Sequence, residues 1–208
     1  MNKMNGLYLK ESFPHLRLRA KKIIGVHRRN HYPNGRIVHD YKCIFIHIPK
    51  TAGNSVTRAL AALPQKQSNL SPKIGKHAKA YEVKYLLGEA IWNEYFTFAF
   101  VRNPWDLMVS SYHWWLQKAG RLSTRYQRHA RRIQKMDGFN AFIQSHYGQK
   151  MINERHGDIF DWISEDGNII VDFVGKVETL QQDWKKICRQ IGVEAADIGH
   201  INKTNGLD

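Results

Sequence analysis

The sequence predicts an α/β fold in three layers, with a central, mainly parallel sheet flanked by helices. Two short apolar runs rich in β-branched and aromatic residues, 43–48 and 96–101, are typical of strands buried on both faces of a parallel sheet. Each run leads through a polar loop into a stretch whose apolar residues have helical spacing. Strands that alternate with helices favour a parallel sheet, and 208 residues are enough to bury one sizeable core.

The elements follow one another from Tyr41, where we expect the folded part to begin. The first strand is predicted over Cys43–Ile48, and the helix after it stops at Pro64 because proline interrupts helical hydrogen bonding. Residues 65–79 are polar and predict a loop. The later predictions, in chain order, are a helix over Tyr81–Tyr95, a strand over Phe96–Val101, a helix over Trp105–Trp115, a helical stretch within Lys118–Met136, a strand over Ile169–Val174 and a helix over Glu178–Ile191.

The chain is strongly basic, with 32 Lys and Arg against 18 acids and a formal net charge of +14. Such a balance indicates an anionic partner without identifying it. Residues 1–38 hold many of the cations and little periodicity, so we expect a basic N-terminal arm followed by one domain over residues 39–208. No apolar run is long enough to span a bilayer or to form a secretory signal, which predicts a cytoplasmic protein.

The cysteines carry little functional information. Cys43 and Cys188 are too few for a disulfide framework, and no Cys/His cluster has the spacing of a zinc site. We therefore expect two free, buried thiols and no metal.

The loop after the first strand has the residues of an anion site. Small residues at Ala52 and Gly53 let the backbone approach an anion, while Asn54 and Ser55 supply side-chain donors. The following helix directs N–H groups and the positive end of its dipole at the same place, and Lys50 adds a charge. The loop is P-loop-like in its physics, but its lysine precedes the last glycine, unlike the Walker pattern. No Walker B strand is apparent.

A second anion site is predicted after the second strand. Arg102 offers a planar fork suited to phosphate, and Ser110 adds a hydroxyl from the next helix. In α/β sheets ligands bind beyond the carboxyl ends of the strands, where both loops should lie. Two such sites on neighbouring strands suit a nucleotide with phosphates at both ends.

Two stretches together resemble a known family. "FIHIPKTAGNS" (Phe45–Ser55) and "FTFAFVRNPWDLMVSSYHW" (Phe96–Trp114) are similar to the 5′-phosphosulfate loop and the 3′-phosphate motif of the Golgi-type and bacterial carbohydrate sulfotransferases, a group that includes heparan sulfate 2-O-sulfotransferase. "VDFVGKVETLQQDWKKICRQIG" (Val171–Gly192) and "HINKTN" (His200–Asn205) resemble later parts of these proteins. The resemblance covers about residues 41–205. Relatives usually continue further, so the domain is expected to lack the usual C-terminal segment.

The resemblance implies transfer of a sulfuryl group from 3′-phosphoadenosine-5′-phosphosulfate (PAPS) to an acceptor hydroxyl, with the bisphosphate PAP as product and no metal. It implies that Lys50, Thr51, Ala52, Gly53, Asn54 and Ser55 hold the 5′-phosphosulfate, and that Arg102, Ser110 and, in the late loop, Lys203 hold the 3′-phosphate. Leu107 stands where relatives often carry a basic residue. A Golgi location would apply only if an N-terminal anchor had been removed.

In-line transfer also needs a base that removes the acceptor's proton, and histidine is the obvious type. His77, on a loop before the second helix, is our predicted base, with Lys50 as the second catalytic residue. Similar bacterial sequences carry a histidine at this place. His47 falls inside the predicted strand, and we interpret it as a structural histidine.

A basic helical face is the predicted acceptor site. Arg121, Arg125, Arg128 and Arg132 share one face of the helical stretch, and their mutual repulsion favours an anionic partner. We expect them to bind an acidic carbohydrate, although the sequence leaves open a tyrosine or another acceptor hydroxyl. Two other classes stay open: a P-loop-like nucleotide kinase or NTPase, and a non-catalytic nucleic-acid-binding protein, which the charge alone suggests and no recognised motif supports.

Overall fold

The central feature of the fold is a four-stranded sheet with the order β1-β2-β3-β6. The computed structural model describes residues 36–64, 74–118, 124–151 and 159–198. The strands are β1 (Ile37–Val38), β2 (Cys43–Ile46), β3 (Phe96–Val101) and β6 (Phe173–Lys176). β1 runs antiparallel to β2, whereas β2, β3 and β6 are parallel, which confirms the predicted mainly parallel sheet.

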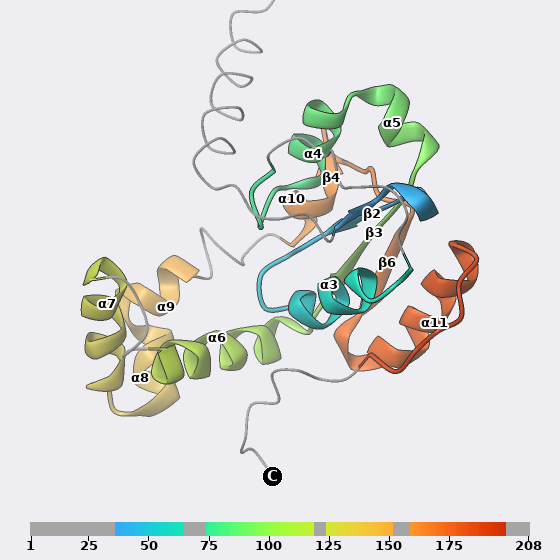
Figure 1. Ribbon diagram of the computed structural model, residues 1–208. Coiled ribbons are helices and arrows are strands. Elements are labelled where there is room, and N and C mark those ends of the chain that lie inside the picture. The colour runs from blue at the N-terminus through green and yellow to red at the C-terminus, as the bar shows by residue number, and fades with distance from the viewer. Residues whose placement is uncertain (1–35, 65–73, 119–123, 152–158, 199–208) are drawn as a thin grey trace, which may run out of the picture.

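Helices cover both faces of the sheet and make three layers (Figure 1). Alternation along β2 directs Ile44 and Ile46 into a core beneath α4 (Ala80–Leu87) and α5 (Glu89–Glu94). Cys43 and Phe45 point the other way, into a core shared with α3 (Gly53–Ala61) and α11 (Leu180–Gln190). The sheet interior is therefore apolar on both sides, as the continuous hydrophobic runs predicted.

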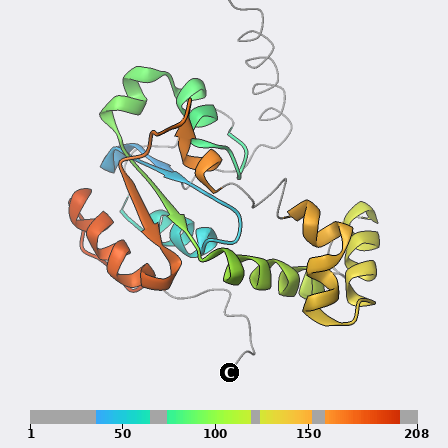
Figure 2. The ribbon, with the colours of Figure 1, turned by 180° about the vertical axis from the view of Figure 1, so that it is seen from behind.

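A separate group of helices extends from the carboxyl end of β3 (Figures 1 and 2). α6 (Pro104–Lys118) leads to α7 (Thr124–Gln134), α8 (Gly138–Gln144) and α9 (His146–Lys150). These helices share their own core, in which Tyr112, Trp115, Ile133 and Phe142 are buried. The sequence predicted α6 and α7 but assigned neither α8 nor α9.

Short elements complete the described chain. They are the 3₁₀ turns His39–Tyr41 and Val177–Thr179, α10 (Phe160–Ile163) and the hairpin of β4 (Ser164–Glu165) with β5 (Asn168–Ile169). Cys43 and Cys188 are free and buried, as predicted. Burial raises the pKa of these thiols to about 12 and about 11, so neither is a thiolate at neutral pH.

Two element predictions were wrong in detail. The helix predicted over Tyr81–Tyr95 is divided because Gly88 adopts φ +84°, a conformation that ends α4 and starts α5. The third strand, predicted over Ile169–Val174, lies at Phe173–Lys176 instead. Its start is set by Asp172, whose carboxylate accepts hydrogen bonds from the Thr97 N–H (2.7 Å) and hydroxyl (2.8 Å) just before the ladder with β3 begins.

The first strand of the sheet lies within the segment predicted as the basic arm. Ile37 and Val38 are buried and pair with Ile44 and Cys43. The boundary at residue 38 therefore fails to separate arm from sheet, because two apolar residues are too few to show a strand period. Residues 1–35 lie outside the described chain.

Candidate functional site

The candidate site lies at the edge of the sheet where β2 and β3 end. Parallel strands present their carboxyl ends at the same edge, and the register pairs Ile46 of β2 with Ala99 of β3. β1 is antiparallel, so it begins at this edge; the Phe45 N–H donates to the Arg36 carbonyl at 2.7 Å. Segments from β1, β2 and β3 thus meet at one place.

The β2–α3 loop, residues 47–52, has an unusual backbone. Lys50 and Ala52 have φ angles of 67° and 59°, in the left-handed region that residues other than glycine rarely adopt. The buried Thr51 hydroxyl donates to the Ile48 carbonyl at 3.0 Å and braces the turn from inside. Its side chain is therefore committed to the loop. Strain of this kind clusters at ligand sites and persists where the surroundings hold it.

The loop delivers the chain into the N-terminus of α3. The Ser55 and Val56 N–H groups donate to the Ala52 carbonyl at 2.9 and 3.2 Å, which closes the first turn. The leading N–H groups of a helix have no partner within it and carry its positive dipole end. Gly53 was predicted to let an anion approach the backbone. The structure gives a different reason for a glycine here, because a Cβ at this position would overlap the His47 ring. The glycine lets the helix start directly against that histidine.

Lys50 connects the two predicted anion sites. Its Nζ lies 5.9 Å from the centroid of the Trp114 ring on α6. Ser110 precedes Trp114 by four residues, so the two share a face of the helix. Ser110 is buried, and Arg102 is half-buried at the end of β3. Lys50 and Arg102 thus follow the ends of neighbouring strands, and Lys50 lies against α6, the helix that carries Ser110.

His77 and His47 are in direct contact. Their ring centroids lie 4.7 Å apart with the rings edge to face, and His77 Nδ1 is 3.1 Å from the His47 carbonyl oxygen. Because a carbonyl only accepts, Nδ1 carries the hydrogen, and in the neutral ring Nε2 is then the acceptor. His77 is exposed and lies before α4, as predicted.

His47 is buried and neutral. It follows β2 directly instead of lying within the strand, and 4% of its surface is exposed. Burial lowers the pKa of His47 to about 2, and electrostatic interactions with His77, Lys76 and Arg36 act in the same direction. Its Nδ1 is buried and finds no hydrogen-bond partner among the described residues.

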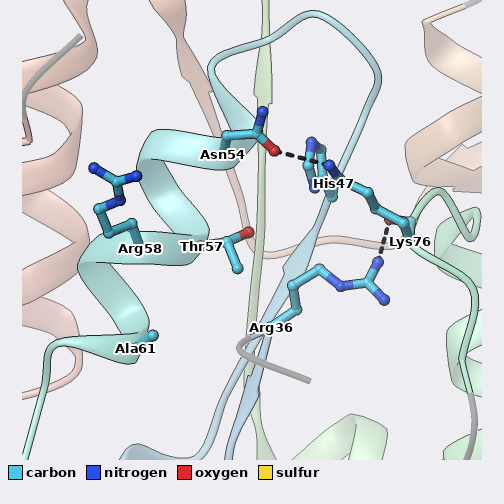
Figure 3. Close-up of a pocket in the computed structure, with 7 residues that line it drawn as sticks. All are labelled: Arg36, His47, Asn54, Thr57, Arg58, Ala61 and Lys76. Carbon is cyan, nitrogen blue, oxygen red and sulfur yellow. Dashed lines mark hydrogen bonds between the residues drawn. The ribbon is translucent and has the colours of Figure 1, made fainter. Parts of the chain in front are cut away.

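A pocket opens beside His47 and the first turns of α3 (Figure 3). We call it the edge pocket; its volume is about 390 Å³, and its lining residues are Arg36, His47, Asn54, Thr57, Arg58, Ala61 and Lys76. Lys76 Nζ donates to Asn54 Oδ1 at 2.8 Å across its mouth. Sequence reasoning missed the pocket because its cations come from separate segments. The available signal was the position of Lys76 beside His77 and of Arg58 one helical turn after Asn54.

The other predicted residues lie elsewhere. Arg128 and Arg132 are exposed on α7, which packs against α6 within the helical group beside the sheet (Figures 1 and 2). The Arg132 guanidinium donates to the Tyr147 hydroxyl at 2.8 Å. Arg125 lies in α7, whereas Arg121 and Lys203 lie outside the described residues. None of the α7 arginines is among the residues that line the edge pocket.

Two general features of the described chain bear on function. Its four described ranges contain no group of three or more His, Cys, Asp or Glu side chains placed to hold a metal ion. Nor does any helix within these ranges combine the length and the apolar character needed to cross a bilayer.

Similarity to known proteins agrees with this geometry. The sulfotransferase family profile matches residues 34–204, a range that includes both strand ends and both loops. A protein of Archaeoglobus fulgidus described as uncharacterized is 26% identical over 121 residues, which cover 57% of this chain and 87% of that protein. No solved structure matches the chain. With most of its length matched by the profile, the chain belongs to the sulfotransferase family.

Proposed function

We propose that this sulfotransferase transfers the sulfuryl group of PAPS to a hydroxyl of a carbohydrate acceptor. The observation that supports this most directly is that Lys50 of the β2–α3 loop lies against Trp114 of α6, the helix that carries Ser110. A nucleotide with phosphates on its 5′ and 3′ positions has charges at both ends and suits that arrangement.

The β2–α3 loop is the proposed site of the 5′-phosphosulfate. Lys50 supplies the mobile positive charge, and the start of α3 at Gly53 supplies N–H groups and the helix dipole. Ala52 and Gly53 contribute backbone, Asn54 and Ser55 contribute side-chain donors, and Thr51 acts by shaping the loop. Charge that develops on the leaving phosphate is stabilised by these preorganised groups, which are worth most during the transfer itself.

The 3′-phosphate is proposed to bind at the end of β3. Arg102 offers paired N–H donors, and Ser110 offers a hydroxyl from α6. Asn103 fixes the start of α6, because its Oδ1 accepts the Trp105 N–H at 3.0 Å. Arg102 is therefore held at a rigid junction between strand and helix. Lys203 stays a proposed contributor to this phosphate.

His77 is proposed as the general base. The acceptor oxygen attacks sulfur as its proton passes to His77 Nε2; the bond between sulfur and the bridging oxygen breaks, and its electron pair leaves with PAP. The hydrogen bond from Nδ1 to the His47 carbonyl sets the ring in the tautomer that this step needs. Lys50 assists by holding the leaving phosphate, and the reaction needs no metal ion.

The acceptor is proposed to be acidic. The net charge of +14 favours anionic partners, and the exposed α7 residues Arg128 and Arg132 present positive charge to solvent. Arg121 and Arg125 belong to the same proposed acceptor face.

The cofactor assignment is tested by thermal shift with three ligands: PAP, AMP and Mg-ATP. We expect PAP to raise the melting temperature far more than AMP at equal concentration, with and without EDTA, because only PAP occupies both anion sites. A larger shift with Mg-ATP that EDTA abolishes would identify a metal-dependent nucleotide enzyme instead.

A further inference from the structure

The edge pocket concentrates positive charge from three separate segments of the chain. Arg36 precedes β1, Arg58 lies on α3 and Lys76 lies on the loop before α4 (Figure 3). The seven lining residues include no acid. Cations that converge on a concave space, and do not merely follow one surface helix, favour an anionic ligand.

The most buried cation of the pocket, Arg36, is held in a fixed position. Arg36 is 4% exposed, and its guanidinium donates to the carbonyls of Ile74 and Gly75 at 3.3 and 2.9 Å and also to that of Lys76. These bonds fix the guanidinium without cancelling its charge. Burial, and then the charge of Arg36, lower the pKa of Lys76, so a bound anion would relieve a repulsion built into the wall.

His47 also belongs to the wall of the pocket. His47 lines the pocket, is 4% exposed, and has at Nδ1 a buried nitrogen with no hydrogen-bond partner within the described part of the chain. The neutral ring is an uncharged part of the wall, so the positive charge of the pocket comes from Arg36, Arg58 and Lys76.

The pocket adjoins the proposed donor site and shares Asn54 with it, but it extends to the other side of β2. In the sheet order, β2 has β1 on one side and β3 on the other. The proposed nucleotide extends from the β2–α3 loop toward Arg102 on the β3 side, whereas Arg36 places the pocket on the β1 side. His77 adjoins the pocket, next in sequence to Lys76 and in contact with the His47 ring. The pocket therefore lies where an acceptor would approach the base.

We propose that the edge pocket binds a carboxylate or sulfate group of the acceptor saccharide, on the sugar that carries the attacking hydroxyl or on its neighbour. This inference rests on the proposed function and assigns the recognition of the acceptor's charge to Arg36, Arg58 and Lys76. Arg58 is exposed and can be changed without disturbing the buried wall. Lys76 and Asn54 close the mouth between this site and the β2–α3 loop.

Calorimetric titration tests the proposal with the full chain saturated with PAP. The probes are a glucuronate-containing tetrasaccharide, a sulfated tetrasaccharide and the carboxyl-reduced, unsulfated counterpart. We expect at least one anionic probe to bind about tenfold more tightly than the neutral one, and Arg58→Gln to remove most of that difference while leaving PAP affinity unchanged. Arg189→Gln, an exposed arginine on α11, is the matched control and should change nothing.

Three results would overturn the inference. Equal affinities for the charged and neutral probes would show that the pocket does not recognise an anionic group of the acceptor. Equal losses of affinity for the anionic probe in Arg58→Gln and Arg189→Gln would show that only the net charge of the protein matters. A loss of PAP affinity in Arg58→Gln as large as the loss for the probe would make the pocket part of the donor site.

A failure of the proposed function gives a different pattern. If PAP does not bind the unaltered chain, the donor assignment is wrong. The pocket can then still be tested by titration without PAP. Arg58→Gln should weaken binding of the anionic probe, and Arg189→Gln should not.

Discussion

Two cationic regions of this chain differ in how their charges are held. In the edge pocket, Arg36, Arg58 and Lys76 come from three segments and surround a space of about 390 Å³, with Arg36 buried and tied to main-chain carbonyls. On α7, Arg128 and Arg132 follow one exposed helix face. Cations along one helix can be recognised in the sequence, whereas the convergence of cations from three segments on one pocket is visible only in the folded chain.

The two regions should therefore differ in what they contribute. Fixed, partly buried cations lose little entropy on binding and act in a lower dielectric, so they can select one group of a ligand. Exposed cations attract an anionic polymer over a longer range and are screened by salt. We therefore expect the edge pocket to select one anionic group of the acceptor, and α7 to attract the acceptor over a longer range.

The largest effect is expected from Lys50→Ala in the β2–α3 loop. Removing the charge beside the leaving phosphate should lower kcat by about 10³-fold, because this group acts most strongly when charge develops there. Transfer of labelled sulfuryl groups from PAPS measures the loss. A fall of less than tenfold would exclude Lys50 from the leaving-group role.

His77→Ala should lower kcat about a hundredfold or more while leaving PAP affinity nearly intact, since the residue acts on the acceptor's proton. The measurement pairs single-turnover transfer with PAP titration. Equal loss of transfer and PAP binding, or loss of neither, would remove His77 from the role of base.

The neutral state of His47 makes a prediction about pH. Its folded pKa of about 2 lies far below the ordinary value of 6.5, so the unfolded state takes up more protons between these limits. Stability should be highest above pH 6.5 and fall with acidification, by about 2 kcal/mol from this residue between pH 6.5 and 5.

Chemical denaturation at several pH values tests this prediction by comparing the chain with His47→Gln. The glutamine variant should show a shallower loss of stability on acidification, because its side chain takes up no proton. Identical slopes would mean that His47 is protonated in the folded protein.

The smallest effect is expected on α7. Charge reversal of Arg128 and Arg132 should raise the acceptor KM a few-fold and flatten its salt dependence without changing PAP affinity, because exposed charges act mainly through steering. Acceptor kinetics at low and high salt provide the measurement. A rise in acceptor KM of about tenfold or more, comparable to the loss of probe affinity expected in Arg58→Gln, would show that the two regions do not differ in what they contribute.

Sequence reasoning recovered the parts of the molecule that depend on local pattern. The strand Phe96–Val101 was predicted with its observed bounds, because its residues are apolar except for Thr97 and the charged Arg102 follows directly. The β2–α3 loop was located as well, since small residues between a strand and a helix are visible in one dimension. The meeting of the carboxyl ends of β2 and β3 at one edge was expected from the parallel topology alone.

What it missed depends on contacts between distant segments. Arg36 was assigned to the basic N-terminal arm, yet its guanidinium is held by carbonyls some 40 residues later in the chain. Position 53 needs a glycine because a Cβ there would overlap the His47 ring, and the sequence does not show that these two residues are in contact. Gly88 divides a helix through its positive φ, which composition alone does not show.

The central claim is that Lys50 and Arg102 hold opposite ends of one nucleotide, and calorimetry with PAP and AMP on three chains tests it most directly. The unaltered chain should prefer PAP by at least tenfold. Arg102→Ala should bring PAP affinity down to that for AMP, whereas Lys50→Ala should weaken both ligands and keep their ratio. A ratio that is unchanged in Arg102→Ala, or that collapses in Lys50→Ala alone, would contradict the account.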